Sequence, residues 1–120
     1  SIAASFQLRR RGVETRIIAG EREPRPDPTL VRQLAEAHRW VDEMKAGRKL
    51  TEVARAWGHS PSYLRTRAPL AFLSPRIQQA ILDGSQPETL TLAVILRAGV
   101  PLDWQAQEHR FGFAQAGPLP

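Results

Sequence analysis

From residue 29 onward, apolar positions recur with the spacing of amphipathic α-helices. The first stripe has apolar residues at i, i+4, i+7, i+10, i+11 and i+14, namely Leu30, Leu34, Ala37, Trp40, Val41 and Met44. Such a stripe predicts a helix that lays one face on a core. Pro28 or Thr29 can begin this helix, and Gly47 can end it.

Capping residues, prolines and glycines divide the rest of the chain into five shorter predicted helices. A Ser-Pro pair supplies an N-cap and then proline at the first helical position, where its missing N–H costs nothing. Such pairs occur at Ser60-Pro61 and at Ser74-Pro75, and Pro69 should limit the helix that begins at Ser60 to about two turns. The five helices are expected over 51–57, 60–68, 74–84, 89–97 and 101–113.

The first twenty-eight residues follow a different pattern. Two short, partly alternating apolar runs, over 6–8 and 13–18, flank three arginines and Gly12, which favours a short β-hairpin. Three prolines among charged residues over 21–28 predict an extended linker. We therefore expect a hairpin and linker over 1–28, an all-α multi-helix bundle over 29–113, and a frayed tail over 114–120.

The composition is that of one folded domain. The chain has 120 residues, of which 42% are hydrophobic, so a single core is expected rather than disorder. It has no cysteine, which excludes disulfides and thiolate metal sites and agrees with a reducing cytosol. The spacing of His38, His59 and His109 matches no metal-ligand pattern. We expect no metal and no cofactor.

Targeting and membrane signals are missing from the sequence. No apolar stretch approaches the roughly 20 residues that a membrane span needs, and the start of the chain lacks the charged region of a signal peptide. The chain also lacks an initiating Met and reads as a fragment of a longer protein. We expect a bacterial cytoplasmic protein without a membrane partner.

The charge balance agrees with a nucleic-acid partner but does not require one. The chain has 17 Lys+Arg against 12 Asp+Glu, a net charge of +5, and only Lys45 and Lys49 among the basic residues are lysine. The planar guanidinium of arginine suits phosphate and guanine edges better than the point charge of lysine does. A genome rich in G and C also enriches arginine, so this bias carries modest weight.

The segment from 50 to 67 has the layout of a helix-turn-helix. Val53, Trp57 and Leu64 are expected to face a core shared by two crossed helices, and Ala54 to lie where those helices approach most closely. Gly58 suits a turn position with positive φ. In DNA-binding proteins of this layout, the second helix enters the major groove. The sequence therefore predicts binding to double-stranded DNA, in pairs on half-sites, which implies a homodimer.

Candidate DNA contacts fall on and around the second helix of this segment. Its predicted interface residues are Ser60, Ser62, Tyr63, Arg65, Thr66 and Arg67, with Arg48 and Lys49 placed to reach backbone phosphates. The residues Arg9, Arg10 and Arg11 form either an arm on the DNA or a solvated turn. Two alternatives stay open: Tyr63 as a core aromatic residue, and Arg67 as a partly buried structural residue.

An enzyme is not expected within this chain. Asp103, Glu108 and His109 lie within one helix length, but six residues separate Asp103 from His109 and turn them to different sides. Asp103 more plausibly favours the start of the last helix. Trp40, Trp57 and Trp104 each lie on the apolar stripe of their own helix, which favours core packing over stacking on single-stranded bases.

Several strings resemble known families of DNA-binding proteins. The residues from Ala54 to Leu64 and the string 70–75 resemble the helix-turn-helix of plasmid-partition (ParB/KorB-type) proteins. A resemblance over about residues 10–113 is to the C-terminal region of bacterial site-specific serine recombinases of the resolvase/invertase type. Its most specific strings are Leu-Ala-Phe-Leu at 70–73 and Pro-Leu-Asp-Trp at 101–104.

The recombinase resemblance implies that this region recognises the recombination site. The catalytic serine would lie upstream, so no serine of this chain inherits the role of nucleophile. Arg67 and Pro69 depart from the family pattern, which has an aliphatic and a basic residue at these positions. The alternatives are a partition-type or repressor DNA-binding domain, and a protein–protein adaptor that uses the front hairpin and the last helix.

Overall fold

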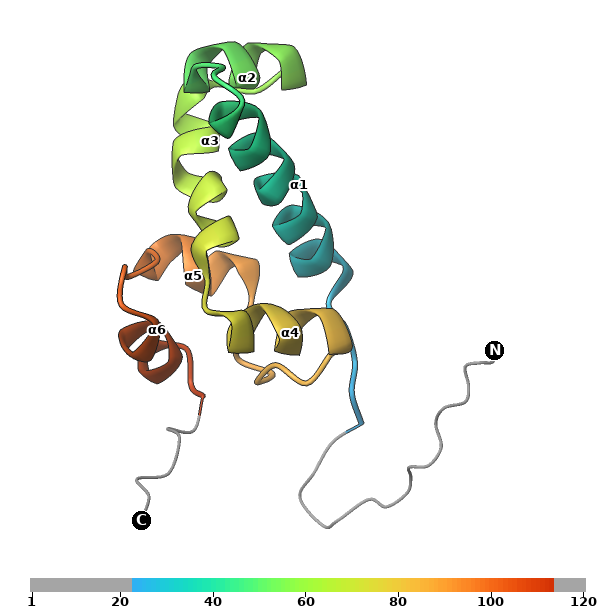
Figure 1. Cartoon of the computed structure of the whole chain (residues 1–120). Coiled ribbons are helices and arrows are strands. Elements are labelled where there is room, and N and C mark those ends of the chain that lie inside the picture. Colours follow the sequence, from blue (N-terminus) through green and yellow to red (C-terminus); the bar gives the residue numbers. More distant parts are fainter. Residues whose placement is uncertain (1–22, 114–120) are drawn as a thin grey trace.

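The computed structural model describes residues 23–113. In that range the chain folds as predicted into helices only, with no strand (Figure 1). The elements are α1 (Pro28–Lys45), α2 (Leu50–Trp57), α3 (Pro61–Arg67), the 3₁₀-helix η1 (Ala68–Phe72), α4 (Pro75–Asp83), α5 (Leu92–Ala98) and α6 (Trp104–Arg110). The predicted hairpin, the arginines at 9–11 and the tail over 114–120 lie outside the described residues.

Side-chain caps begin most of these helices. Each capping side chain accepts a hydrogen bond from a backbone N–H of the first turn; the caps are Asp27, Ser60, Ser74, Thr91 and Asp103. The predicted start of the fifth helix near Thr89 is wrong, because the chain first makes a turn in which the Leu90 N–H donates to the Pro87 carbonyl at 2.9 Å. The helix therefore begins after Thr91.

Pro69 limits α3 but does not end the helical path. The helix α3 covers seven residues, as the proline predicts, and the chain then continues directly into η1. Pro69 takes one of the first positions of this 3₁₀-helix, where a proline needs no N–H partner. As a result Leu70 is carried into the core and is only 1% exposed.

The helix α1 is the element around which the domain is built. It lies beside α3 and η1, while α2 crosses one end of the molecule and α4, α5 and α6 gather toward the other (Figure 1). The predicted stripe of α1 is buried except for Met44, which is half-buried. The core unites side chains from all the helices except α6, including Leu30, Leu34, Ala37, Trp40, Val53, Leu64, Leu73, Ile77, Ile81 and Ile95.

The expectation that all three tryptophans pack in the core is correct for Trp40 and for Trp57, which packs against the core, and is wrong for Trp104. Trp40 is fully buried, Trp57 is half-buried, and Trp104 is 53% exposed. Trp104 is the first residue of α6, directly after its cap, and the buried position on that helix belongs to Gln107 instead. A polar residue thus replaces an apolar one at the point where α6 joins the fold.

Gln107 joins three segments that are far apart in the sequence. Its Oε1 accepts a hydrogen bond from the backbone N–H of Ser74 at 2.6 Å. Its Nε2 donates to the carbonyls of Phe72 at 3.1 Å and Pro101 at 2.6 Å. Because the Gln107 side chain is 1% exposed, these bonds satisfy its own buried amide as well as the buried N–H of Ser74. They fix α6 beside the end of η1.

Candidate nucleic-acid interface

The turn between α2 and α3 is fixed by contacts between residues that are close in the sequence. Gly58 has φ +78°, a left-handed conformation that only glycine adopts without strain. The next residue, His59, donates its N–H to the carbonyl of Ala54 at 2.9 Å, and Ala54 itself is fully buried, as predicted. The Ser60 hydroxyl accepts from the N–H of Tyr63 at 3.1 Å. These contacts set the direction in which α3 leaves the turn.

One face of α3 is open to solvent. Leu64 points into the core and is fully buried, whereas Ser62, Arg65 and Thr66 are all exposed. This spacing of i, i+3 and i+4 places the three polar side chains on one side of the helix. The Thr66 hydroxyl donates to the Tyr63 carbonyl at 3.0 Å and accepts a long hydrogen bond from Arg67 Nη1 at 3.4 Å, which leaves one of its two lone pairs for a further donor. Of the predicted contacts, these three form the exposed face.

Tyr63 and Arg67 take part in the packing of the motif. The ring of His59 stacks on the ring of Tyr63 with centroids 4.0 Å apart and planes 19° apart. The Arg67 guanidinium carbon lies 3.9 Å from the same ring centroid, so His59 and Arg67 must cover opposite faces of it. Tyr63 also meets the buried ring of Trp40 edge to face at 6.1 Å. The geometry supports the structural alternative for both residues.

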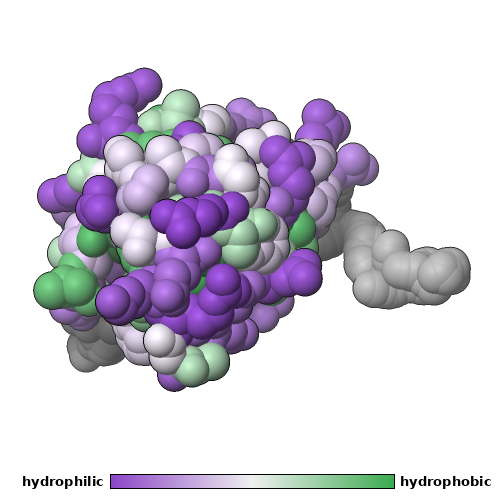
Figure 2. Space-filling view, turned by 90° about the horizontal axis from the view of Figure 1, so that it is seen from above, coloured by the Kyte–Doolittle hydropathy of each residue, from purple (hydrophilic) through white to green (hydrophobic). Residues whose placement is uncertain are grey.

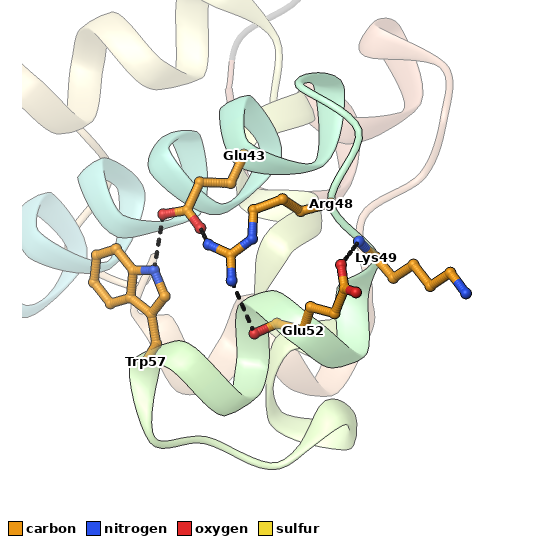
Figure 3. Close-up of polar contacts among 5 residues, drawn as sticks. All are labelled: Glu43, Arg48, Lys49, Glu52 and Trp57. Atoms are coloured by element: carbon orange, nitrogen blue, oxygen red, sulfur yellow. Dashed lines mark hydrogen bonds and ion pairs between the residues drawn. The ribbon is translucent and has the colours of Figure 1, made fainter.

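A carboxylate on α1 holds both ends of α2 (Figure 3). Glu43 Oε1 pairs with Arg48 Nη1 at 2.6 Å, and Oε2 accepts from the Trp57 indole N–H at 3.1 Å. Arg48 also donates to the carbonyl of Glu52 at 3.4 Å, and the Glu52 carboxylate accepts from the Lys49 N–H at 2.9 Å. We call this set the Glu43 clasp. A phosphate contact by Arg48, which stays a prediction, has to compete with Glu43.

Positive charge concentrates around the motif. Between residues 39 and 67 the chain carries seven arginines and lysines and three carboxylates. From Val53 to Leu82 there is no Asp or Glu at all, so α3 is free of acidic neighbours in its own segment. Viewed from above, onto the end that holds α2, the surface is mostly hydrophilic, with apolar groups in small separate areas (Figure 2).

Two further arginines, Arg55 and Arg39, lie near the motif although no sequence pattern singled them out. Arg55 is exposed on α2, and Arg39 lies on α1 with its guanidinium carbon 5.3 Å from the centroid of the Trp57 ring. The helical period alone places Arg55 on the polar face of α2, so this residue could have been found. Arg39 could not, because its position over Trp57 depends on how α1 and α2 pack.

The carboxylates considered for catalysis, Asp103 and Glu108, make contacts that serve the fold. Asp103 caps α6 by accepting from the Ala106 N–H at 3.0 Å, and Glu108 pairs with Arg76 at 3.2 Å. Within residues 23–113 no group of His, Asp and Glu side chains is arranged to hold a metal ion. None of the helices described is both long and apolar enough to cross a membrane.

Comparison with known proteins gives no further guide to this arrangement. No family model, no curated protein and no solved structure matches the chain. A functional proposal therefore depends on the geometry of α3 and its surroundings.

Proposed function

We propose that this chain binds double-stranded DNA by placing α3 in the major groove. The observation that carries the proposal is the exposed face of α3, where Ser62, Arg65 and Thr66 project from a helix whose other side is anchored by buried Leu64. A rigid helix with hydrogen-bonding side chains on its outer face matches the depth and width of that groove.

The roles of the individual side chains follow from their surroundings. Arg65 has no ion pair with any described residue, so its guanidinium is available for a guanine edge. Ser62 and Thr66 can bond bases or phosphates. Lys49 and Arg55 are exposed near the start and on the outer side of α2, the helix that crosses the DNA backbone in such motifs. Arg67 orients Tyr63 and adds positive charge nearby.

We further propose that the DNA bound is a recombination site and that this chain is the recognition part of a serine recombinase. The strings that carry this resemblance coincide with structural joints: Leu70 and Leu73 are buried, and Pro101 accepts a hydrogen bond from Gln107. The gene that encodes this chain tests this proposal: an upstream domain with a nucleophilic serine would support it. A gene with no such domain favours a partition-type or repressor protein.

Selection of bound sequences from a random duplex pool tests the DNA-binding proposal and yields the preferred site. On that site, Arg65→Ala should weaken binding by about 1–3 kcal/mol and relax the preference at one base position. Affinity should fall as salt rises, because phosphate contacts release counterions. The matched control is Arg97→Ala, an exposed arginine on α5 with no ion pair in the described range, which should change affinity little. Equal affinity of Arg65→Ala and the parent contradicts the assignment of α3.

A further inference from the structure

Arg39 is an exposed arginine of α1 whose expected acidic partner is already engaged. On a helix, a carboxylate four residues away is a common partner of a basic side chain, and for Arg39 this position holds Glu43. One oxygen of Glu43 pairs with Arg48, and the other accepts from the Trp57 indole N–H (Figure 3). The Glu43 clasp therefore leaves Arg39 beside the Trp57 ring, whose centroid lies 5.3 Å from the guanidinium carbon.

The N–H donors of Arg39 stay open to solvent. Glu36 and Asp42 lie three residues to either side of Arg39, yet between residues 23 and 113 no carboxylate forms an ion pair with it. An aromatic ring attracts a guanidinium without accepting the N–H donors that point outward in the guanidinium plane, so these donors remain free for another acceptor. Arg67 differs, because it lies 3.9 Å from the Tyr63 centroid and its Nε is buried.

Trp57 places Arg39 at the end of α2 that adjoins α3. Trp57 is the last residue of α2, and only residues 58–60 separate it from α3. Lys49, which the proposed function places beside the DNA backbone, lies at the opposite end of α2. A helix of eight residues is about 12 Å long, and a DNA strand carries one charge about every 3.4 Å along the duplex axis. Cations at the two ends of α2 can therefore reach different phosphates of the strand that α2 crosses.

We propose that Arg39 is a phosphate contact of the DNA-binding surface and that Trp57 is the residue that positions it. This inference rests on the proposed function, since it adds a residue of α1 to the same surface. The Trp57 ring restrains a long side chain before DNA binds, so less conformational entropy is lost on binding. The guanidinium donates to phosphate oxygens, and because α1 stays outside the groove, this contact carries no information about the base sequence.

Salt titration of duplex binding by the 120-residue chain tests the contact, on the site selected from the random pool. One phosphate contact contributes about 0.9 to the slope of log affinity against log salt concentration. Arg39→Gln should lower the slope by about this amount, so that raising the salt from about 50 to about 200 mM weakens the variant about 3.5-fold less than the parent. Arg39→Lys keeps the charge and should keep the slope. The preferred bases should be the same for Arg39→Gln and the parent.

The matched control is Arg32→Gln, because Arg32 is exposed on the same side of α1 and has no ion pair with a described residue. It lies seven residues before Arg39, about 10 Å farther from α2, and its loss should leave the slope unchanged. A parental slope for Arg39→Gln, an equal loss of slope for Arg32→Gln, or a changed base preference in Arg39→Gln overturns the proposal. A parent without salt-dependent duplex affinity refutes the proposed function itself, whereas a parent that binds while Arg39→Gln keeps the parental slope refutes this contact alone.

Nitrogen-15 relaxation of the arginine Nε groups in the DNA-free chain tests the role of Trp57. The Arg39 Nε should be more restricted in motion than the Arg32 Nε, because the Trp57 ring holds the Arg39 side chain. Trp57→Leu removes the ring and should remove this difference. Equal mobility of the two groups in the parent, or a difference that persists in Trp57→Leu, refutes the positioning role; the comparison within the parent decides the question where the variant does not fold.

Discussion

Replacing Glu43 by alanine should destabilise the domain measurably, because one carboxylate holds α1 to both ends of α2. Its ion pair with Arg48 joins side chains that are 31% and 45% exposed, and exposed pairs contribute about 0.2–1 kcal/mol. Its hydrogen bond with the half-buried Trp57 indole adds about 0.5–1.5 kcal/mol. The loss of both should lower the free energy of unfolding by about 0.7–2.5 kcal/mol, or the unfolding midpoint by roughly 3–20 °C for a domain of this size.

Urea and thermal unfolding, followed by tryptophan fluorescence and circular dichroism, measure this loss. Double-mutant cycles separate its two parts: coupling of Glu43→Ala with Arg48→Ala should shrink in high salt, whereas coupling with Trp57→Phe should not. The control is Asp42→Ala, which removes an exposed carboxylate from the neighbouring position of α1. If Glu43→Ala unfolds within about 0.3 kcal/mol of Asp42→Ala, the clasp contributes nothing and the reasoning is wrong.

Two further predictions concern buried contacts between segments of the fold. Each compares a substitution at a buried residue with the same substitution at an exposed residue, by the free energy of unfolding in urea. Gly84→Ala should lower the free energy of unfolding by about 2–4 kcal/mol, because a Cβ at this position, where φ is +83°, would lie 2.6 Å from Pro26. Gly58→Ala should lower it by only about 1 kcal/mol, because Gly58 has φ +78° but nothing within 4 Å of its Cβ position. Equal losses for the two variants contradict a close approach at Gly84. Gln107→Leu should cost about 2–3 kcal/mol, because it leaves the buried Ser74 N–H without its acceptor and removes the donor of two part-buried carbonyls. Exposed Gln105→Leu should stay within about 0.5 kcal/mol of the parent. A well-folded Gln107→Leu variant of parental stability refutes the role of this side chain.

The helices were predictable because their boundaries depend on neighbouring residues. A Ser-Pro pair contains both the cap and the first helical residue, so the starts at Ser60 and Ser74 needed no knowledge of the rest of the chain. Gly58 ends α2 for an equally local reason. Two starts were misplaced: the last helix begins after Asp103 instead of at Pro101, and the fifth begins after Thr91 instead of near Thr89, where two threonines compete as caps. The turn that decides between them depends on how Leu90 is buried, at 2% exposure.

The side chains of α6 show where local reasoning fails. Hydrophobicity predicts that Trp104 is buried and that Gln107 is exposed, and the structure has the reverse. The bonds of Gln107 reach Ser74 and Phe72, which are 33 and 35 residues away in the sequence. A polar residue takes a core position only when distant backbone groups satisfy it, and a helical period contains no information about those groups.

The arginines of the candidate interface show the same difference between what the local sequence predicts and what the fold decides. Composition and spacing treat Arg48, Arg65 and Arg67 alike, as basic residues beside or on a recognition helix. The fold separates them: Arg48 meets a carboxylate from α1, Arg67 covers the ring of Tyr63, and Arg65 has no ion pair with any residue between 23 and 113. What decides availability is therefore the acidic or aromatic group within reach, not the number of arginines. Part of that criterion is visible in the sequence, since the absence of Asp and Glu from residues 53 to 82 by itself favours Arg65 over Arg48. Under the proposed function, the arginines available to DNA are those for which the fold supplies no acidic partner and no aromatic ring that buries them.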